Sequence, residues 1–503
     1  MGLNNLIANY FGQGFMALLG ILAIPIVVSN LGVEAYGLVG LFAVAQAFSV
    51  LLDLGMAPTL SREFARYRAG IRPYHSILDL LRTFELIVLA AATVSLTLTA
   101  LSAGAIASNW ATNSSINTLS IQGSILLMAA VTAATVCSSL YRTALIGMQE
   151  QVTLNIIEVV FATVKFLGLI LLFTTLNNRS VVVFFSWHLL VSILALITFR
   201  RQLFNSLPKS EYKGRFSASA VSDVRRFALG VVGTTLIGTL LSQFDKMLLS
   251  ANLTLEQWGE YSIAFTISGS LVTFVTPINQ TLIPLFTNAY ALRDEDQLIY
   301  LYHLGTQLVV ISAGSFALFA LFFPDVVWAL WTSNVPFSNA SLFVLRLLIF
   351  GRLLNVIISI PYEVQLAAGW SSLSLLCNVT GAVFMIPLMM FAVPLYKELA
   401  ASLLWTMLNI YYMIFMLHVM HKKLLVGQKY AWYLRDILKP LSAGTLLMTI
   451  ATTVNTGTLS KVNSIVFMFL SIALTVLTMI VVSTTARKTL VLKLSSAMIR
   501  VKK

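Results

Sequence analysis

The chain has 503 residues, of which 58% are hydrophobic and only 10% are charged, whereas ordinary globular proteins have about 25% charged residues. A soluble protein with so few charges could not cover its surface, so this composition excludes soluble, disordered and fibrous proteins and indicates an integral membrane protein. The net charge of +13 would suit a nucleic-acid-binding protein, but the positions of the basic residues favour a different explanation.

Apolar segments recur along the whole chain. A membrane span needs ~20 mostly apolar residues, because its backbone amides must be hydrogen-bonded within the segment. Fourteen segments meet this requirement: 5–29, 37–60, 82–106, 119–146, 154–176, 181–200, 227–250, 259–286, 300–323, 340–366, 372–392, 398–418, 441–457 and 464–484. The sequence therefore predicts an all-α, polytopic membrane protein with about 14 transmembrane helices. The first segment has no signal-peptide cleavage site and is predicted to be a retained helix.

The basic residues lie mostly in loops on one side of the predicted membrane. If the N-terminus is cytoplasmic, 24 of the 32 Lys and Arg residues lie in cytoplasmic segments, and only Arg179, Lys397 and Lys461 lie in outer ones. Basic loops are retained on the cytoplasmic side, so both termini are predicted to be cytoplasmic. Anionic membrane lipids are the natural partners of such loops, and no nucleic-acid partner is expected.

A short motif occurs twice, after the first and after the seventh predicted span. Leu31–Gly37 and Leu253–Gly259 share a Leu, a Glu, an aromatic residue and a Gly at an offset of 222 residues. The repeat predicts an N-lobe at 1–226 and a C-lobe at 227–425, each of six helices. Residues 426–503 would add helices 13 and 14 and a basic cytoplasmic tail. Transporters built from parallel repeats bind their substrate at the repeat interface.

Ionisable residues within the predicted spans are the candidate site residues, because a charge at bilayer depth costs roughly 3 kcal/mol or more. Cations at graded depths favour a cavity that binds an anionic cargo, since Arg offers phosphate a planar fork and Lys a point charge. Buried carboxylates are candidates for exchanging H+ or binding Na+. The cations are Arg142, Lys165, Lys246, Arg346 and Arg352, the candidate coupling acids are Asp53, Glu158, Asp245 and Glu363, and Glu85 is a further acid.

These charges could instead serve structure alone. Glu158 and Lys165 lie about 10 Å apart along one helix, which is too far for a direct pair. Asp245 and Lys246 are adjacent and are expected to point in different directions, and Lys246 could reach the membrane interface from its span end. Asp53, beside Gly55, could cap or pack the inner end of the second span.

The chain resembles the Wzx-type flippases of the polysaccharide biosynthesis (export) protein family, in the multidrug/oligosaccharidyl-lipid/polysaccharide (MOP) superfamily. The resemblance lies in Leu31–Gly37, in Leu52–Met56 followed by Arg62 and Arg66, and in Phe244–Leu249. It implies two six-helix lobes, a central cavity and alternating access. It also implies a cargo of undecaprenyl pyrophosphate-linked oligosaccharide, such as an O-antigen unit, that crosses the bacterial inner membrane. A polysaccharide polymerase and a chain-length regulator are candidate partners.

Other functions stay open beside this one. The related lipid II flippases carry arginines in the first, second and eighth spans. The first and eighth spans here carry no arginine and instead have the polar residues Asn9, Gln13, Asn279 and Gln280, so lipid II is a less favoured cargo. A multidrug and toxic compound extrusion (MATE)-like cation antiporter is the main alternative, although such an exporter needs an acidic cavity. A membrane polymerase or glycosyltransferase is less favoured, because no nucleophile and base, phosphate-binding Gly loop, cofactor motif or metal-ligand spacing is found. The protein is therefore predicted not to be an enzyme.

Overall fold

The computed structural model of the chain describes residues 3–53, 55–111, 114–175, 179–212, 214–219, 222, 236, 239–240, 242–332, 338–454 and 456–489. The chain divides into two compact units, Met1–Ser262 (unit 1) and Ile263–Lys503 (unit 2). Much of the predicted seventh span and the tail beyond residue 489 lie outside the described residues, as do the side chains of Asn9 and Gln13. The lobe border at 226/227 stays a prediction.

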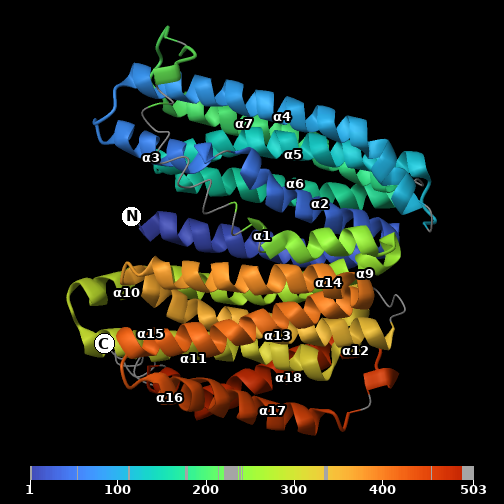
Figure 1. Cartoon of the computed structure of the whole chain (residues 1–503), viewed down its shortest axis with the longest axis vertical. Helices are drawn as coiled ribbons and strands as arrows, with labels where there is room; N and C mark the ends of the chain where they lie inside the picture. Colours follow the sequence, from blue (N-terminus) through green and yellow to red (C-terminus); the bar gives the residue numbers. More distant parts are fainter. Residues whose placement is uncertain are drawn as a thin grey trace, which may run out of the picture. The chain divides into compact units, whose positions relative to one another are not determined.

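Unit 1 is built around α5, which packs against both α4 and α7, while α1 packs against α6 (Figure 1). Its helices are α1 (Leu3–Leu31), α2 (Val33–Leu52), α3 (Met56–Arg68), α4 (Tyr74–Ala111), α5 (Thr118–Gly147), α6 (Gln151–Thr175) and α7 (Val181–Ser206), and α9 (Leu255–Gly269) begins in this unit.

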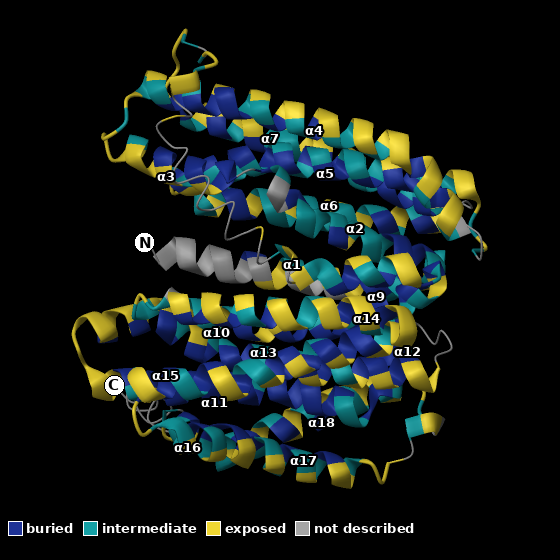
Figure 2. Cartoon of the chain, in the orientation of Figure 1, coloured by how far each residue is buried: buried dark blue, intermediate teal, exposed yellow. Residues whose placement is uncertain are grey.

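Unit 2 is built around α11, which packs against α10, α13, α17 and α18. Figure 2 shows α11 as mostly buried. The elements are α10 (Leu271–Ala291), α11 (Glu295–Phe322), α12 (Pro324–Thr332), α13 (Asn339–Ala367), α14 (Ser371–Tyr411), the π-helix η1 (Tyr412–Met416), α15 (Leu417–Lys423), α16 (Lys429–Ala431), the π-helix η2 (Trp432–Leu438), α17 (Lys439–Ala451), the 3-10 helix η3 (Thr456–Thr458) and α18 (Lys461–Val482).

The predicted all-helical membrane architecture is confirmed. Within the described ranges every regular element is a helix, and nine helices are long and apolar enough to cross a membrane. One of these, Ser372–Lys423, contains two predicted spans, 372–392 and 398–418. The backbone leaves the helical conformation between them, at Lys397 (φ 49°, ψ −133°), so the two spans are separate helices that meet at a kink.

The predicted second span, 37–60, is wrong as a single helix, because α2 ends at Leu52 and α3 begins at Met56. Gly55 between them has a φ of +70°, a left-handed conformation that only glycine adopts at little cost. The Asp53 carboxylate accepts a 2.9 Å hydrogen bond from the Ala57 N–H and so satisfies an amide of the first turn of α3.

The two copies of the repeated motif lie against each other in unit 1. A Cβ added to Gly37 would lie 2.5 Å from the carbonyl oxygen of Leu255, and one added to Gly259 would meet the carbonyl oxygen of Val33 even more closely. The offset of 222 residues relates Gly37 to Gly259 and Val33 to Leu255. The copies therefore exchange equivalent contacts, as the two sides of a two-fold contact do, and glycine permits the close backbone approach.

Candidate functional site

Arg142 and Glu158 form an ion pair between α5 and α6. The Arg142 Nε donates a 2.8 Å hydrogen bond to Glu158 Oε1, and the guanidinium lies 5.8 Å from the ring centre of Phe199 on α7. Glu158 thus pairs with a neighbouring helix and not with Lys165 on its own helix. The pair neutralises one candidate cargo-binding cation and one candidate coupling acid together.

Asp245 and Lys246 form a second ion pair, with 3.0 Å between Lys246 Nζ and Asp245 Oδ1. Both residues are buried; Lys246 also donates to the Ser242 carbonyl, and Tyr261 donates to Asp245. The expectation that the two side chains point in different directions is therefore wrong, as is the alternative that Lys246 reaches the interface. The long, flexible Lys stem folds back along its helix, because an unpaired buried ammonium would cost far more.

Lys165 lies on α6 as a half-buried cation. Among the described residues, no carboxylate lies within ion-pair distance of its ammonium. Its backbone carbonyl accepts a 3.2 Å hydrogen bond from Trp187 Nε1, which fixes α6 against α7. Trp187 also lines an apolar cavity of about 450 Å³ between these helices, together with Thr163 and Gly168. Lys165 is thus a cation that an external anion could neutralise.

Arg346 and Arg352 both lie on α13 but have different neighbours. Arg346 is exposed, and its Nε donates a 3.1 Å hydrogen bond to the carbonyl oxygen of Leu321. The Arg352 guanidinium lies 5.5 Å from the ring centre of Phe265 and 5.1 Å from that of Trp405. Aromatic faces stabilise a guanidinium electrostatically, so Phe265 and Trp405 help to hold the Arg352 charge beside α13.

The remaining candidate acids have different surroundings. The bonds between Asp53 and the Ala57 N–H match the capping role considered from the sequence. Glu85 accepts hydrogen bonds from Tyr141 (2.6 Å) and Arg82 (2.8 Å). Glu363 is half-buried on α13, and its Oε2 has no hydrogen-bond partner among the described residues. Glu363 is therefore the candidate coupling acid with spare acceptor capacity.

Sequence analysis missed a buried polar network in unit 2. Asp436 of η2 is fully buried; it contacts His303 Nδ1 and accepts from Gln307 Nε2 (2.6 Å) and Arg435 Nε (3.1 Å). The other ring nitrogen of His303, Nε2, lies 2.9 Å from Gln428 Oε1, so both ring nitrogens have a hydrogen-bonding partner. Apart from Arg435, which is adjacent to Asp436, the partners are more than a hundred positions apart, and no local motif marks them.

The comparisons with known proteins agree with this architecture. The family model described as "Polysaccharide biosynthesis protein" matches residues 3–289, which is more than half of the chain. No curated protein matches. A solved structure of an inward-facing multidrug resistance MATE family transporter of the MOP superfamily has 14% identity and a TM-score of 0.63, and the match covers 84% of this chain and 97% of that one.

Two further solved structures are similar. The lipid II flippase MurJ, in an inward closed conformation, has 13% identity and a TM-score of 0.65, with 97% of this chain and 100% of that one covered. A MOP superfamily transporter from Pyrococcus furiosus, reported with a binding pocket of reversed polarity, has 16% identity and a TM-score of 0.55, with 83% and 95% covered. At these identities the likeness shows the fold, which this chain shares with these polytopic transporters.

Proposed function

Since the chain belongs to the polysaccharide biosynthesis protein family, we propose that it is a flippase for lipid-linked oligosaccharides. It carries a repeat unit of an O-antigen or a related surface polysaccharide, linked to undecaprenyl pyrophosphate, from the cytoplasmic to the outer leaflet of the bacterial inner membrane. Transport proceeds by alternating access, with both termini cytoplasmic and with H+ or Na+ as the coupling ion. The family match and the MOP fold support the coarser part of this proposal, a membrane transporter or flippase.

The environment of Lys165 is the observation that carries the choice of a phosphate-bearing cargo. A lysine within an apolar span costs roughly 3 kcal/mol, and in the described structure no acid offsets that cost. Arg142 and Lys246 already have carboxylate partners. A pyrophosphate that passes α6 would supply the missing negative charge, and the moderate strength of a single Lys contact lets the head group leave again.

The extent of the structural matches also favours a lipid-carrying flippase. The MurJ match covers 97% of this chain, whereas the MATE match covers 84%. The fold of nearly the whole chain thus has a counterpart in a lipid II flippase.

Substitution of Lys165 tests the proposal. The Lys165→Gln variant is expected to abolish surface polysaccharide and to make lipid-linked repeat units accumulate, because the pyrophosphate loses its counter-charge. The Lys165→Arg variant keeps the charge and is expected to retain export. Both readouts are measured in cells that lack the native gene, with the membrane level of each variant checked by immunoblot. Normal surface polysaccharide from Lys165→Gln at wild-type protein level would rule the mechanism out.

Export of cationic drugs is a second candidate function. It is favoured by Glu363, whose Oε2 has no hydrogen-bond partner among the described residues. A cation exporter needs an acidic group in its pathway, and a Glu363→Gln variant would then lose drug resistance. The two functions are distinguished by expressing the protein in a drug-sensitive strain. Resistance to cationic dyes that depends on Glu363, with surface polysaccharide unchanged in the Lys165→Gln variant, would replace the flippase proposal.

A further inference from the structure

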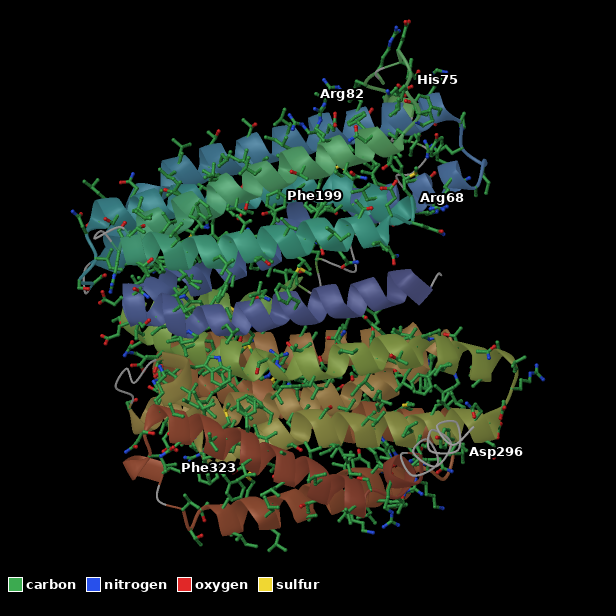
Figure 3. The ribbon with its side chains drawn as sticks, turned by 180° about the vertical axis from the view of Figure 1, so that it is seen from behind. Arg68, His75, Arg82, Phe199, Asp296 and Phe323 are labelled. Carbon is green, nitrogen blue, oxygen red and sulfur yellow. The ribbon has the colours of Figure 1, made fainter. Side chains whose placement is uncertain are left out.

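A basic pocket of about 430 Å³ lies at one end of unit 1, where α4 begins and α7 ends. Three cations line it: Arg82 on α4, Arg200 on α7 and Lys209 in the loop after α7. Leu78 and Phe204 supply apolar wall. None of the described residues that line the pocket is acidic. Figure 3 shows Arg82 on α4 near the end from which this loop projects. The pocket includes none of the five cations predicted to bind the transported cargo.

The loop that closes this pocket is fixed to α4 by several contacts. Tyr74 donates a 3.0 Å hydrogen bond to the Pro208 carbonyl, and Tyr212 donates one of 2.5 Å to Asp79. The rings of His75 and Tyr212 meet edge to face with 4.4 Å between their centres. The bond to Asp79 raises the pKa of the Tyr212 hydroxyl, so this side chain stays neutral. The pocket is therefore formed before any ligand arrives, which lowers the entropy cost of binding.

The charges behind the pocket leave it positive. Glu85 lies 2.8 Å from Arg82 Nη1 and 3.9 Å from Arg200 Nε, so this carboxylate faces two guanidinium groups, and it also accepts a hydrogen bond from Tyr141. Glu85 alone cannot neutralise both arginines. The nearby Asp79 carboxylate accepts hydrogen bonds from Tyr212 and the Arg215 N–H, and the Lys209 charge keeps the lining positive. The arginines are thus oriented by Glu85 and still able to bind an anion, for which their planar donors suit phosphate.

Apolar side chains continue from the pocket along the two helices. On α4, Leu86 and Leu89 are 39% and 57% exposed, and on α7 Ile197 and Phe204 are 42% and 41% exposed. Leu86 and Leu89 follow Arg82 at helical spacings of four and seven, so the three share one face of α4. Figure 2 shows exposed residues, in yellow, along α4. The surface therefore joins a positively charged pocket to a row of exposed apolar side chains on α4 and α7.

We propose that this pocket binds the phosphate head group of an anionic phospholipid, with the acyl chains along α4 and α7. The predicted orientation places it at the cytoplasmic leaflet, where anionic lipids gather. A free phosphate ion shares the head-group chemistry but would make no use of the apolar track. The proposal does not depend on the identity of the cargo, so the test of this lipid site is independent of the test of the flippase function.

Lipid binding to the purified full-length protein tests the proposal. Native mass spectrometry is used to titrate phosphatidylglycerol, with phosphatidylcholine and inorganic phosphate as comparison probes. The double variant Arg200→Gln/Lys209→Gln is expected to weaken phosphatidylglycerol binding at least tenfold, because it removes two of the three cations that line the pocket. Arg201→Gln is the matched control, since Arg201 is exposed on the same turn and is absent from the pocket lining.

The comparison probes decide the source of the phosphate. Tight phosphatidylglycerol binding, weak binding of phosphatidylcholine and inorganic phosphate, and less than a twofold effect of Arg201→Gln would support the site. An equal loss in Arg201→Gln would show diffuse attraction to the basic surface and overturn it. Inorganic phosphate that binds as tightly as the lipid would overturn the assignment to a lipid. Phosphatidylglycerol binding that the double variant leaves unchanged would place the lipid elsewhere and likewise overturn it.

Discussion

Replacing Gly259 with alanine is expected to destabilise unit 1 by about 1–3 kcal/mol, the usual cost of overpacking a close contact, and to abolish transport. The added Cβ would meet the Val33 carbonyl oxygen closer than the 3.0 Å that real Cβ atoms keep from other heavy atoms. The obstacle is backbone and cannot rotate away, so the junction between α1 and α2 must shift. Gly37→Ala is expected to act in the same way through Leu255.

Thermal unfolding of the purified protein and surface polysaccharide in cells measure these effects. Gly269→Ala is the control on the same helix, since no atom lies within 4 Å of its added Cβ and alanine favours a helix by up to about 1 kcal/mol over glycine. The double variant Gly37→Ala/Gly259→Ala should cost less than the two single losses combined, because both act on one crossing. Additive losses, or wild-type stability of Gly259→Ala, would mean that the two motif copies do not depend on each other.

The sequence carries the repeat but not the contact between its copies. The shared letters of Leu31–Gly37 and Leu253–Gly259 predict that the two segments are related, and the glycines could be recognised as close-approach positions. Which backbone each glycine meets is a matter of tertiary packing, which no local pattern contains. The break at Asp53 and Gly55 is different, because an Asp and a Gly just ahead of an amphipathic segment are a readable helix-start signal.

The candidate charges were visible in the sequence, but their partners were not. Hydropathy identifies Arg142 and Lys165 equally well as charges within apolar segments. In the described structure only Arg142 forms an ion pair with an acid. The difference arises from the α5–α6 packing, which turns Glu158 toward α5. For Asp245 and Lys246 the prediction is wrong, because the Cα–Cβ bonds of adjacent helical residues diverge but their side-chain ends can still meet. A lysine stem is long enough to bring its ammonium back beside the preceding residue.

The Asp436 network could not be predicted from the sequence either. Most of its members come from distant segments, and none of them belongs to a recognisable motif. Its position gives it a structural task. Gln307 of α11 donates to Asp436 and also accepts a 2.8 Å hydrogen bond from the Ala486 N–H. One carboxylate thus joins the central helix of unit 2 to η2, which leads into α17, and through Gln307 to the segment that follows α18. Polar contacts as well as apolar packing therefore hold α17 and the segment after α18 to α11.

The Asp436→Asn variant is therefore expected to lose about 3–5 kcal/mol, the usual cost of breaking a buried ion pair by removing one partner. Asparagine keeps the shape but removes the negative charge that His303, Gln307 and Arg435 contact, and its NH2 group would face these donors. The measurements are the thermal unfolding midpoint and hydrogen exchange over residues 483–489, where protection should fall. Glu295→Gln, at an exposed position at the start of α11, is the matched control and should change stability by less than about 0.5 kcal/mol.

A second variant separates the charge from the packing. Replacing both partners, as His303→Leu/Asp436→Leu, removes the buried carboxylate together with the ring that contacts it, and apolar replacement of a whole buried pair is often tolerated. This double variant should therefore be more stable than Asp436→Asn, even though it changes more atoms. If it were less stable, hydrogen bonds to Gln307 and Gln428 would outweigh the ion pair. If Asp436→Asn unfolded like the wild-type protein, the negative charge of Asp436 would contribute nothing to the stability of unit 2.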